Sequence, residues 1–171
     1  MRGHIVDMVA LTELTQAHGV KVIEDCAHTM GAKWDNVWSG RSGVIGCYFS
    51  QTYKHINSGE GGFLICDDEE IMARAIILSG SYMIYEKCRA GPPPETFKKL
   101  KLTTPNISGR MDNLRAAILR PQLRCLESQC EAWNERYRVV DSALAQVPGL
   151  TCVVRPHQEH FVASSYQFLL L

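Results

Sequence analysis

A helix-forming segment runs directly into a short apolar strand near the start of the chain, and this junction constrains the fold more than any other feature. Residues 7–18 repeat apolar side chains along one helical face, and Gly19 ends the pattern. That face holds Met8, Leu11, Leu14 and Ala17. The run VKVIED (20–25) follows with no hairpin turn between the two elements. A helix that leads into a strand in this way is typical of an α/β unit, so we expect an α/β fold.

The rest of the first half repeats this alternation. Residues 47–50 and 63–67 predict two more strands, separated by a polar and glycine-rich loop. Residues 31–43 are rich in turn-forming residues and predict a hairpin-like excursion. Residues 67–78 begin with four carboxylates, which favour a helix because they stabilise the positive end of its dipole.

The second half is less regular. Residues 79–109 contain three consecutive prolines, and the segment is long enough to be a functional loop. A helical pattern runs from 111 to about 145, and Pro121 is expected to kink it or divide it in two. Two strand-like runs follow at 150–154 and 164–171.

Composition excludes several classes of protein. The formal net charge is zero, from 18 basic and 18 acidic side chains, which argues against a nucleic-acid-binding protein. No apolar run is long enough for a membrane helix, and the first residues lack the pattern of a secretory signal. Seven scattered cysteines without a Cys-x-x-Cys pair predict free thiols in a reducing cytoplasm, with no disulfide framework and no metal site.

Two residues at expected strand ends could carry chemistry. Asp25 closes the apolar run 20–25, where open α/β sheets place ligand-binding residues, although a helix cap or a loop salt bridge would also explain it. Lys54 follows the next strand, in a loop that ends Gly59-Glu60-Gly61-Gly62, although a solvated surface charge is the ordinary reading of a lysine. Neither GxxxxGK nor GxGxxG is present, so neither of these nucleotide-binding motifs is supported.

Pyridoxal 5'-phosphate (PLP) chemistry uses such a pair of groups. The lysine amine forms a Schiff base with the cofactor, and the aspartate pairs with the protonated pyridine nitrogen. The ring then withdraws electrons from the carbanion that forms after proton abstraction, and the released lysine moves that proton.

Three segments in the same order resemble the DegT/DnrJ/EryC1/StrS family of PLP-dependent sugar and cyclitol aminotransferases. They are HIVDMVALTELTQAHGVKVIEDCAHTMGA, CYFSQTYKHINSGEGGFLICDDEE and NISGRMDNLRAAILRPQL, and together they cover roughly residues 3 to 126. The resemblance implies part of a fold type I large domain, a mainly parallel sheet flanked by helices. It implies a partial PLP-binding large domain over 1–110, a long connecting helix over 111–145, and the start of a truncated small C-terminal domain over 146–171.

The same resemblance assigns roles to individual residues. Lys54 is the Schiff-base lysine, Asp25 is the partner of the pyridine nitrogen, and Ala27 packs on one face of the ring. His28 stands near the phenolic oxygen of the ring, unless it is an ordinary polar loop histidine.

Two further cofactor contacts follow from the resemblance. Asn106 is similar to the asparagine that reaches the cofactor phosphate of a neighbouring subunit. Ser50 is a candidate phosphate ligand, but it stands one residue closer to the lysine than the serine of many members, and one residue changes the face of an extended segment. Thr52 is therefore its rival.

The implied function is transfer of an amino group from glutamate or glutamine onto a nucleotide-linked keto-sugar or a keto-cyclitol, by a homodimer. The alternative is a truncated, catalytically inactive fragment or binding remnant of that family. A histidine in place of Lys54 would have indicated the dehydratase branch, and the lysine argues against it.

Overall fold

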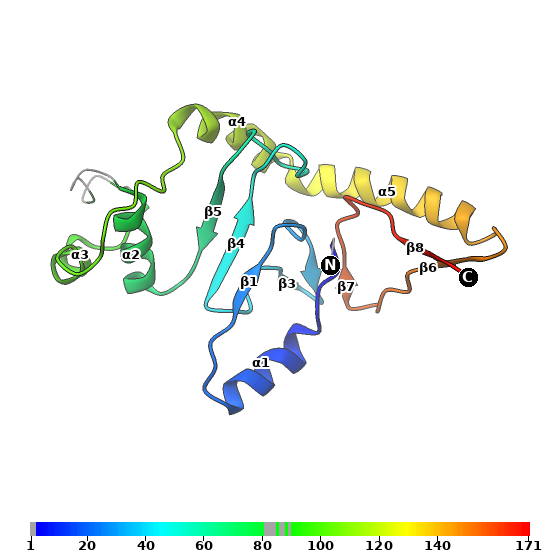
Figure 1. The fold of residues 1–171 in the computed structure, drawn as a ribbon, viewed down its shortest axis with the longest axis horizontal. Coiled ribbons are helices and arrows are strands. Elements are labelled where there is room, and N and C mark those ends of the chain that lie inside the picture. The colour runs from blue at the N-terminus through cyan, green and yellow to red at the C-terminus, as the bar shows by residue number, and fades with distance from the viewer. Residues whose placement is uncertain (1–2, 81–84, 86–87, 89) are drawn as a thin grey trace.

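A three-stranded sheet with helices around it organises the molecule in the computed structural model, which describes residues 3–80, 85, 88 and 90–171. The sheet has the order β1 (Ile23–Asp25), β4 (Ile45–Phe49), β5 (Gly62–Ile65). Figure 1 shows these strands at the centre. The expected α/β class is confirmed.

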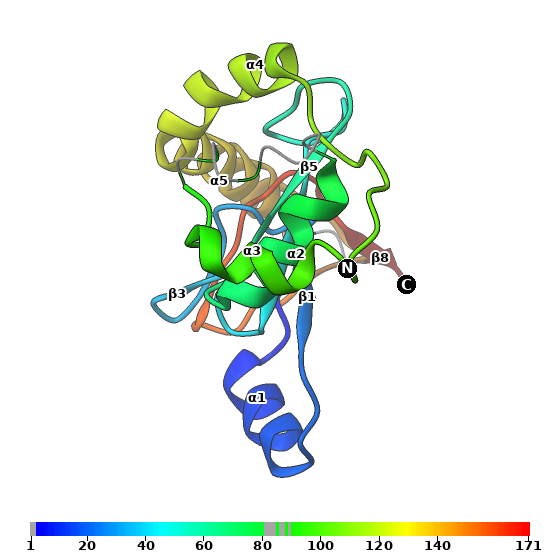
Figure 2. The same cartoon turned by 90° about the vertical axis from the view of Figure 1, so that its left-hand side faces the viewer.

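The first helix, α1 (Met8–Ala17), begins where the sequence predicts. The Asp7 side chain accepts a hydrogen bond from the backbone N–H of Ala10 at 3.0 Å, and Gly19 follows the helix with a φ of +64°. The expected apolar face is only partly buried: Met8 lies inside, whereas Leu14 is 60% exposed. α1 projects away from the sheet in both views (Figures 1 and 2), so little of the described chain covers it.

The strand pairing differs from the mainly parallel sheet that the sequence suggested. β1 and β4 are parallel, with Asp25 opposite Cys47, but β4 and β5 are antiparallel. A parallel return requires a long crossover, usually a helix. The loop 50–61 contains no helix and folds back on itself, so β5 runs antiparallel to β4.

The excursion over residues 31–43 is a hairpin, as predicted. β2 (Lys33–Trp34) pairs antiparallel with β3 (Val37–Trp38). A strand that the sequence did not reveal, β7 (Glu159–His160), adds to the other edge of β2. It has only two residues, too few for a periodic pattern.

Two helices follow β5. In α2 (Glu69–Ser79), the Asp68 side chain accepts hydrogen bonds from two backbone N–H groups of the first turn, as the acidic start suggested. The segment 79–109 is not entirely loop, because α3 (Pro94–Leu100) forms directly after the other two prolines. Within the segment 79–109, residues 81–84, 86–87 and 89 lie outside the described part of the chain. α2 and α3 pack together through Ala73, Ile77, Phe97 and Leu100.

The long helical pattern of residues 111–145 is divided, as expected, but not at the proline. α4 (Asn113–Arg124) runs past Pro121 and ends at Cys125, where α5 (Leu126–Leu144) begins. The two strand-like runs beyond it pair antiparallel as β6 (Leu150–Cys152) and β8 (Phe168–Leu170).

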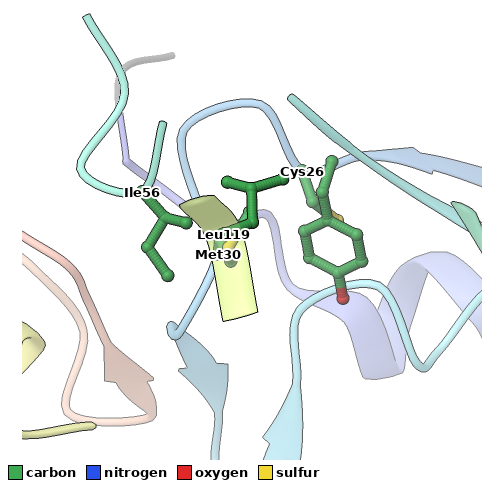
Figure 3. Packing of buried hydrophobic residues seen from close by; sticks show 5 residues of the cluster. Cys26, Met30, Ile56 and Leu119 are labelled. Carbon is green, nitrogen blue, oxygen red and sulfur yellow. The ribbon is translucent and has the colours of Figure 1, made fainter. Parts of the chain in front are cut away.

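A small apolar cluster connects α4 to the sheet. Its buried members come from the ends of β1 and β4, the loops beyond them, and α4: Cys26, Met30, Tyr48, Ile56 and Leu119. Figure 3 shows Leu119 among the side chains of the loops. Within the described ranges, no helix is both long and apolar enough to cross a membrane.

Candidate active site

Two loops leave the sheet on the same side and bring the predicted site residues toward one another. Because β1 and β4 are parallel and in register, the turn after β1 (26–30) and the loop after β4 (50–61) start from the same edge of the sheet. Asp25 ends β1, and Lys54 lies in the second loop.

Asp25 is held by the start of its own turn. One carboxylate oxygen, Oδ1, accepts a hydrogen bond from the backbone N–H of Ala27 at 3.0 Å. The other oxygen accepts no hydrogen bond from the described residues, and the residue is exposed to solvent. A carboxylate fixed by one oxygen and open at the other is able to pair with a cationic group of a ligand.

Buried polar contacts of Glu24 and Cys26, the residues on either side of Asp25, hold the turn in place. The Glu24 carboxylate accepts hydrogen bonds from the backbone N–H groups of Gly40, Ser42 and Gly43 at 2.6–2.7 Å. The Ser39 hydroxyl donates to Sγ of Cys26 at 3.3 Å. Burial raises the pKa of the Cys26 thiol, so it stays neutral beside the carboxylate of Asp25.

The central contact of the site joins the two loops. Nζ of Lys54 lies 3.1 Å from Nε2 of His28, and both side chains are half-buried. The Lys54 backbone N–H donates to the carbonyl of Gln51 at 2.9 Å, which closes a turn around the lysine. The structure therefore places the predicted lysine against the histidine three residues after Asp25, rather than in open solvent.

His55 makes a second connection between the loops, which the sequence did not reveal. Its Nε2 donates to the carbonyl oxygen of Met30 at 2.7 Å. Burial, with smaller contributions from the charges of His28 and Lys54, lowers the pKa of His55, so its imidazole is neutral near neutral pH. No sequence pattern predicts that a histidine beside a lysine will bond to the carbonyl of a residue in another loop.

The far end of the lysine loop is anchored to α4. Ile56 is fully buried and packs in the cluster that contains Leu119. The backbone of Asn57 exchanges two hydrogen bonds with the side chain of Gln122, at 3.0 and 2.7 Å. No local pattern predicts this contact, because its partners lie 65 residues apart in the chain.

The glycines that end the loop stand where a side chain would be strained or would clash. Gly59 and Gly61 have φ values of +87° and +125°, which L side chains rarely adopt. A Cβ on Gly62 would lie 2.5 Å from the carbonyl oxygen of Tyr48 on the paired strand. These positions allow the loop to turn back into β5.

The two candidate phosphate ligands, Ser50 and Thr52, differ in how accessible their hydroxyls are. Ser50 is fully buried, and its Oγ lies 3.1 Å from Oγ of Ser58, so the hydroxyl is engaged inside the loop. Thr52 is exposed, and its hydroxyl donates to the carbonyl of Gly59 at 3.0 Å. Accessibility therefore favours Thr52 over Ser50 as a ligand of a bound phosphate, and both roles stay predictions.

Asn106 lies beside the C-terminal end of α2. It is exposed, and its Oδ1 accepts from the backbone N–H of Ser108 at 2.9 Å. It stands beside Gly80, where an added Cβ would lie 2.4 Å from that same oxygen. It makes no hydrogen bond to Asp25 or Lys54 in the described part of the chain.

The groups that the two loops present fit a cofactor with an aldehyde and a protonated ring nitrogen. Lys54 supplies an amine, Asp25 an open carboxylate oxygen, and Ala27 a small side chain beside it. Among the residues described, no group of three or more His, Cys, Asp and Glu side chains could hold a metal ion.

Comparison with known proteins identifies the family. The model of the DegT/DnrJ/EryC1/StrS aminotransferase family matches residues 1–171. The chain belongs to this family, and the resemblance seen in its three motifs is confirmed.

Curated relatives include cyclitol aminotransferases. A protein of Micromonospora echinospora, provisionally named L-glutamine:3-amino-2,3-dideoxy-scyllo-inosose aminotransferase, is 41% identical over 77 residues, which are 45% of this chain and 18% of the relative. A protein of Streptoalloteichus tenebrarius with the same provisional name is 28% identical over 153 residues, 90% of this chain and 35% of the relative.

A solved structure confirms the fold. The aminotransferase TlmJ from Streptoalloteichus hindustanus superposes with a TM-score of 0.80 at 23% identity, over 99% of this chain and 44% of TlmJ. The fold is therefore part of the fold type I architecture. The chain spans less than half the length of these proteins.

Proposed function

We propose that this chain carries the lysine side of the active site of a PLP-dependent aminotransferase. The whole protein would move an amino group from glutamine or glutamate onto a nucleotide-linked keto-sugar or a keto-cyclitol. The observation that supports this most strongly is the 3.1 Å approach of Lys54 Nζ to His28 Nε2, beside the strand that ends in Asp25.

Each residue has a defined task in this proposal. When bound, PLP supplies an electron-withdrawing ring that stabilises negative charge at the amino-bearing carbon of the substrate. Lys54 would hold the cofactor through Nζ and, as a free amine, would take the proton from that carbon and deliver it to the cofactor as the amino group moves there. Oδ2 of Asp25 would pair with the protonated ring nitrogen, while Ala27 N–H keeps Oδ1 in place.

His28 orients the lysine. In the tautomer that has its proton on Nδ1, Nε2 accepts a hydrogen bond from the Lys54 ammonium, so the amine is directed toward the turn that follows Asp25. Ala27 is half-buried, and its small side chain would pack against one face of the ring.

We further propose a homodimer in the cytoplasm. The exposure of Asn106 agrees with a role at the cofactor of a neighbouring subunit. All seven cysteines are unpaired, which agrees with a reducing compartment. The two names among the relatives favour glutamine as donor and a keto-cyclitol as acceptor.

A half-reaction tests the activity. PLP-loaded protein is mixed with L-glutamine in the absence of any sugar, and the 2-oxo acid released is quantified. We expect about one equivalent per bound cofactor, and none from Lys54→Ala, whereas Lys33→Ala behaves as the parent. No 2-oxo acid from a protein that still binds PLP at Lys54 would favour the alternative, an inactive fragment.

A further inference from the structure

Gln122 holds the lysine loop from outside the site. Its Nε2 donates to the carbonyl oxygen of Asn57 at 2.7 Å, and its Oε1 accepts from the N–H of Asn57 at 3.0 Å. One side-chain amide thus satisfies both backbone groups of Asn57, as a neighbouring strand would. None of the described strands pairs with the loop at this point, so the amide takes that place.

The contact continues to the lysine itself. Nδ2 of Asn57 donates to the carbonyl oxygen of Lys54 at 3.2 Å. The N–H of Lys54 is bonded to Gln51, so the carbonyl of Lys54 is the backbone group that Asn57 links to Gln122. A shift of Asn57 would therefore move the origin of the Lys54 side chain.

Gln122 is itself held in place on α4. Gln122 Nε2 also donates to the carbonyl of Ile118 at 2.9 Å, which fixes the orientation of the amide on α4. One turn earlier, Leu119 is only 3% exposed and packs in the same cluster as Ile56 (Figure 3). The helix is thus fastened to the loop by apolar packing on one side of Asn57 and by the amide at Asn57.

We propose that Gln122 is a positioning residue for Lys54: through Asn57 it holds the amine against His28 and keeps it ready for the cofactor. This inference rests on the proposed function. A purely structural role would make Gln122 important for the attachment of α4 without affecting how Lys54 reacts.

The test measures Lys54 directly, in the protein without cofactor. Trace acetylation is followed by peptide mass spectrometry, and the rate at Lys54 is divided by the rate at Lys98, whose side chain is 65% exposed. Gln122→Met keeps the shape and loses the polar contacts, Gln122→Glu keeps the acceptor, and Gln146→Met, an exposed glutamine, is the matched control.

We expect the rate ratio to rise about threefold or more in Gln122→Met, because the released loop exposes the half-buried amine, and the loss of a hydrogen bond typically has an effect of about this size. Gln122→Glu should give a smaller rise, and Gln146→Met none. A ratio unchanged in Gln122→Met and Gln122→Glu, with only a lower melting temperature, would overturn the proposal. If Gln122→Met does not fold, the result with Gln122→Glu decides.

A second measurement separates this inference from the proposed function. PLP is added, borohydride fixes it, and labelling at Lys54 is compared between variants. We expect about tenfold less label in Gln122→Met than in the parent, a size that corresponds to the loss of one or two hydrogen bonds. Equal labelling would overturn the positioning role alone. A parent that is not labelled at Lys54 would overturn the proposed function, whatever the acetylation shows.

Discussion

Nζ of Lys54 and Nε2 of His28 lie 3.1 Å apart, although 26 residues separate them in the sequence. The contact exists because β1 and β4 run parallel and in register, so that the loops after both strands start from one edge. This contact with His28 orients the amine of Lys54.

Removing the His28 imidazole should weaken PLP capture without affecting the fold. His28→Ala eliminates the 3.1 Å contact, and the loss of one hydrogen bond corresponds to a fall of roughly threefold to tenfold in PLP affinity. Absorbance titration with PLP measures it. His157→Ala, at an exposed histidine, is the control, and an equal affinity in both variants would contradict the role of His28.

The tether at His55 should make stability depend on pH. Burial lowers the pKa of His55 in the folded chain below its value of about 6.5 in the unfolded chain, so the unfolded chain binds more protons as the pH falls. The contribution of the neutral imidazole is complete above pH 6.5 and is lost as the pH falls toward the lower, folded-state pKa.

We therefore expect His55→Gln, which still has an N–H for the Met30 carbonyl, to flatten the decline in stability between pH 7 and pH 5. Urea unfolding at a series of pH values measures it. His157→Gln should keep the slope of the parent, and a parental slope in His55→Gln would exclude His55 as its source.

The buried side chain beside Lys54 should dominate the stability of the loop. Ile56→Ala removes a fully buried side chain, and we expect the free energy of unfolding to fall by about 2–5 kcal/mol. Ile107→Ala, at an isoleucine that is 67% exposed, should change it by less than about 0.5 kcal/mol. Denaturant unfolding compares the two, and similar losses in both variants would contradict the packing described for α4.

The buried carboxylate of Glu159 should be equally sensitive. It accepts from Nη1 of Arg155 at 3.1 Å and from the N–H of Ile5 at 2.8 Å, and its side chain has no exposed surface. Glu159→Ala leaves the buried Arg155 without its carboxylate, and such a loss costs about 3–5 kcal/mol. Glu95→Ala removes an exposed partner of Lys98 and should change stability little. Equal denaturation midpoints in the two variants would refute this.

Helix starts and the hairpin were predictable from the sequence, because neighbouring residues determine them. The start of α1 at Asp7, the start of α2 at Asp68 and the hairpin over residues 31–43 follow from caps and turns that the sequence displays. The α/β class was predictable because the expected helices and strands stand in the right order. The joint role of Asp25 and Lys54 stays a prediction.

Contacts between distant residues were not predictable in this way. The bonds of Gln122 to Asn57 and of His55 to Met30 depend on how α4 and the two loops pack, and no spacing encodes that. The antiparallel direction of β5 was not predicted for a similar reason, since a glycine-rich loop does not show whether the chain crosses over or folds back.

Mapping the site of PLP attachment tests the central claim most directly. The parent protein, Lys54→Ala and Lys33→Ala are incubated with PLP, reduced with borohydride, digested and sequenced by mass spectrometry. We expect label on the peptide that contains Lys54 in the parent and in Lys33→Ala, and none on that peptide in Lys54→Ala. Label spread over the exposed lysines, with equal incorporation into all three proteins, would contradict it.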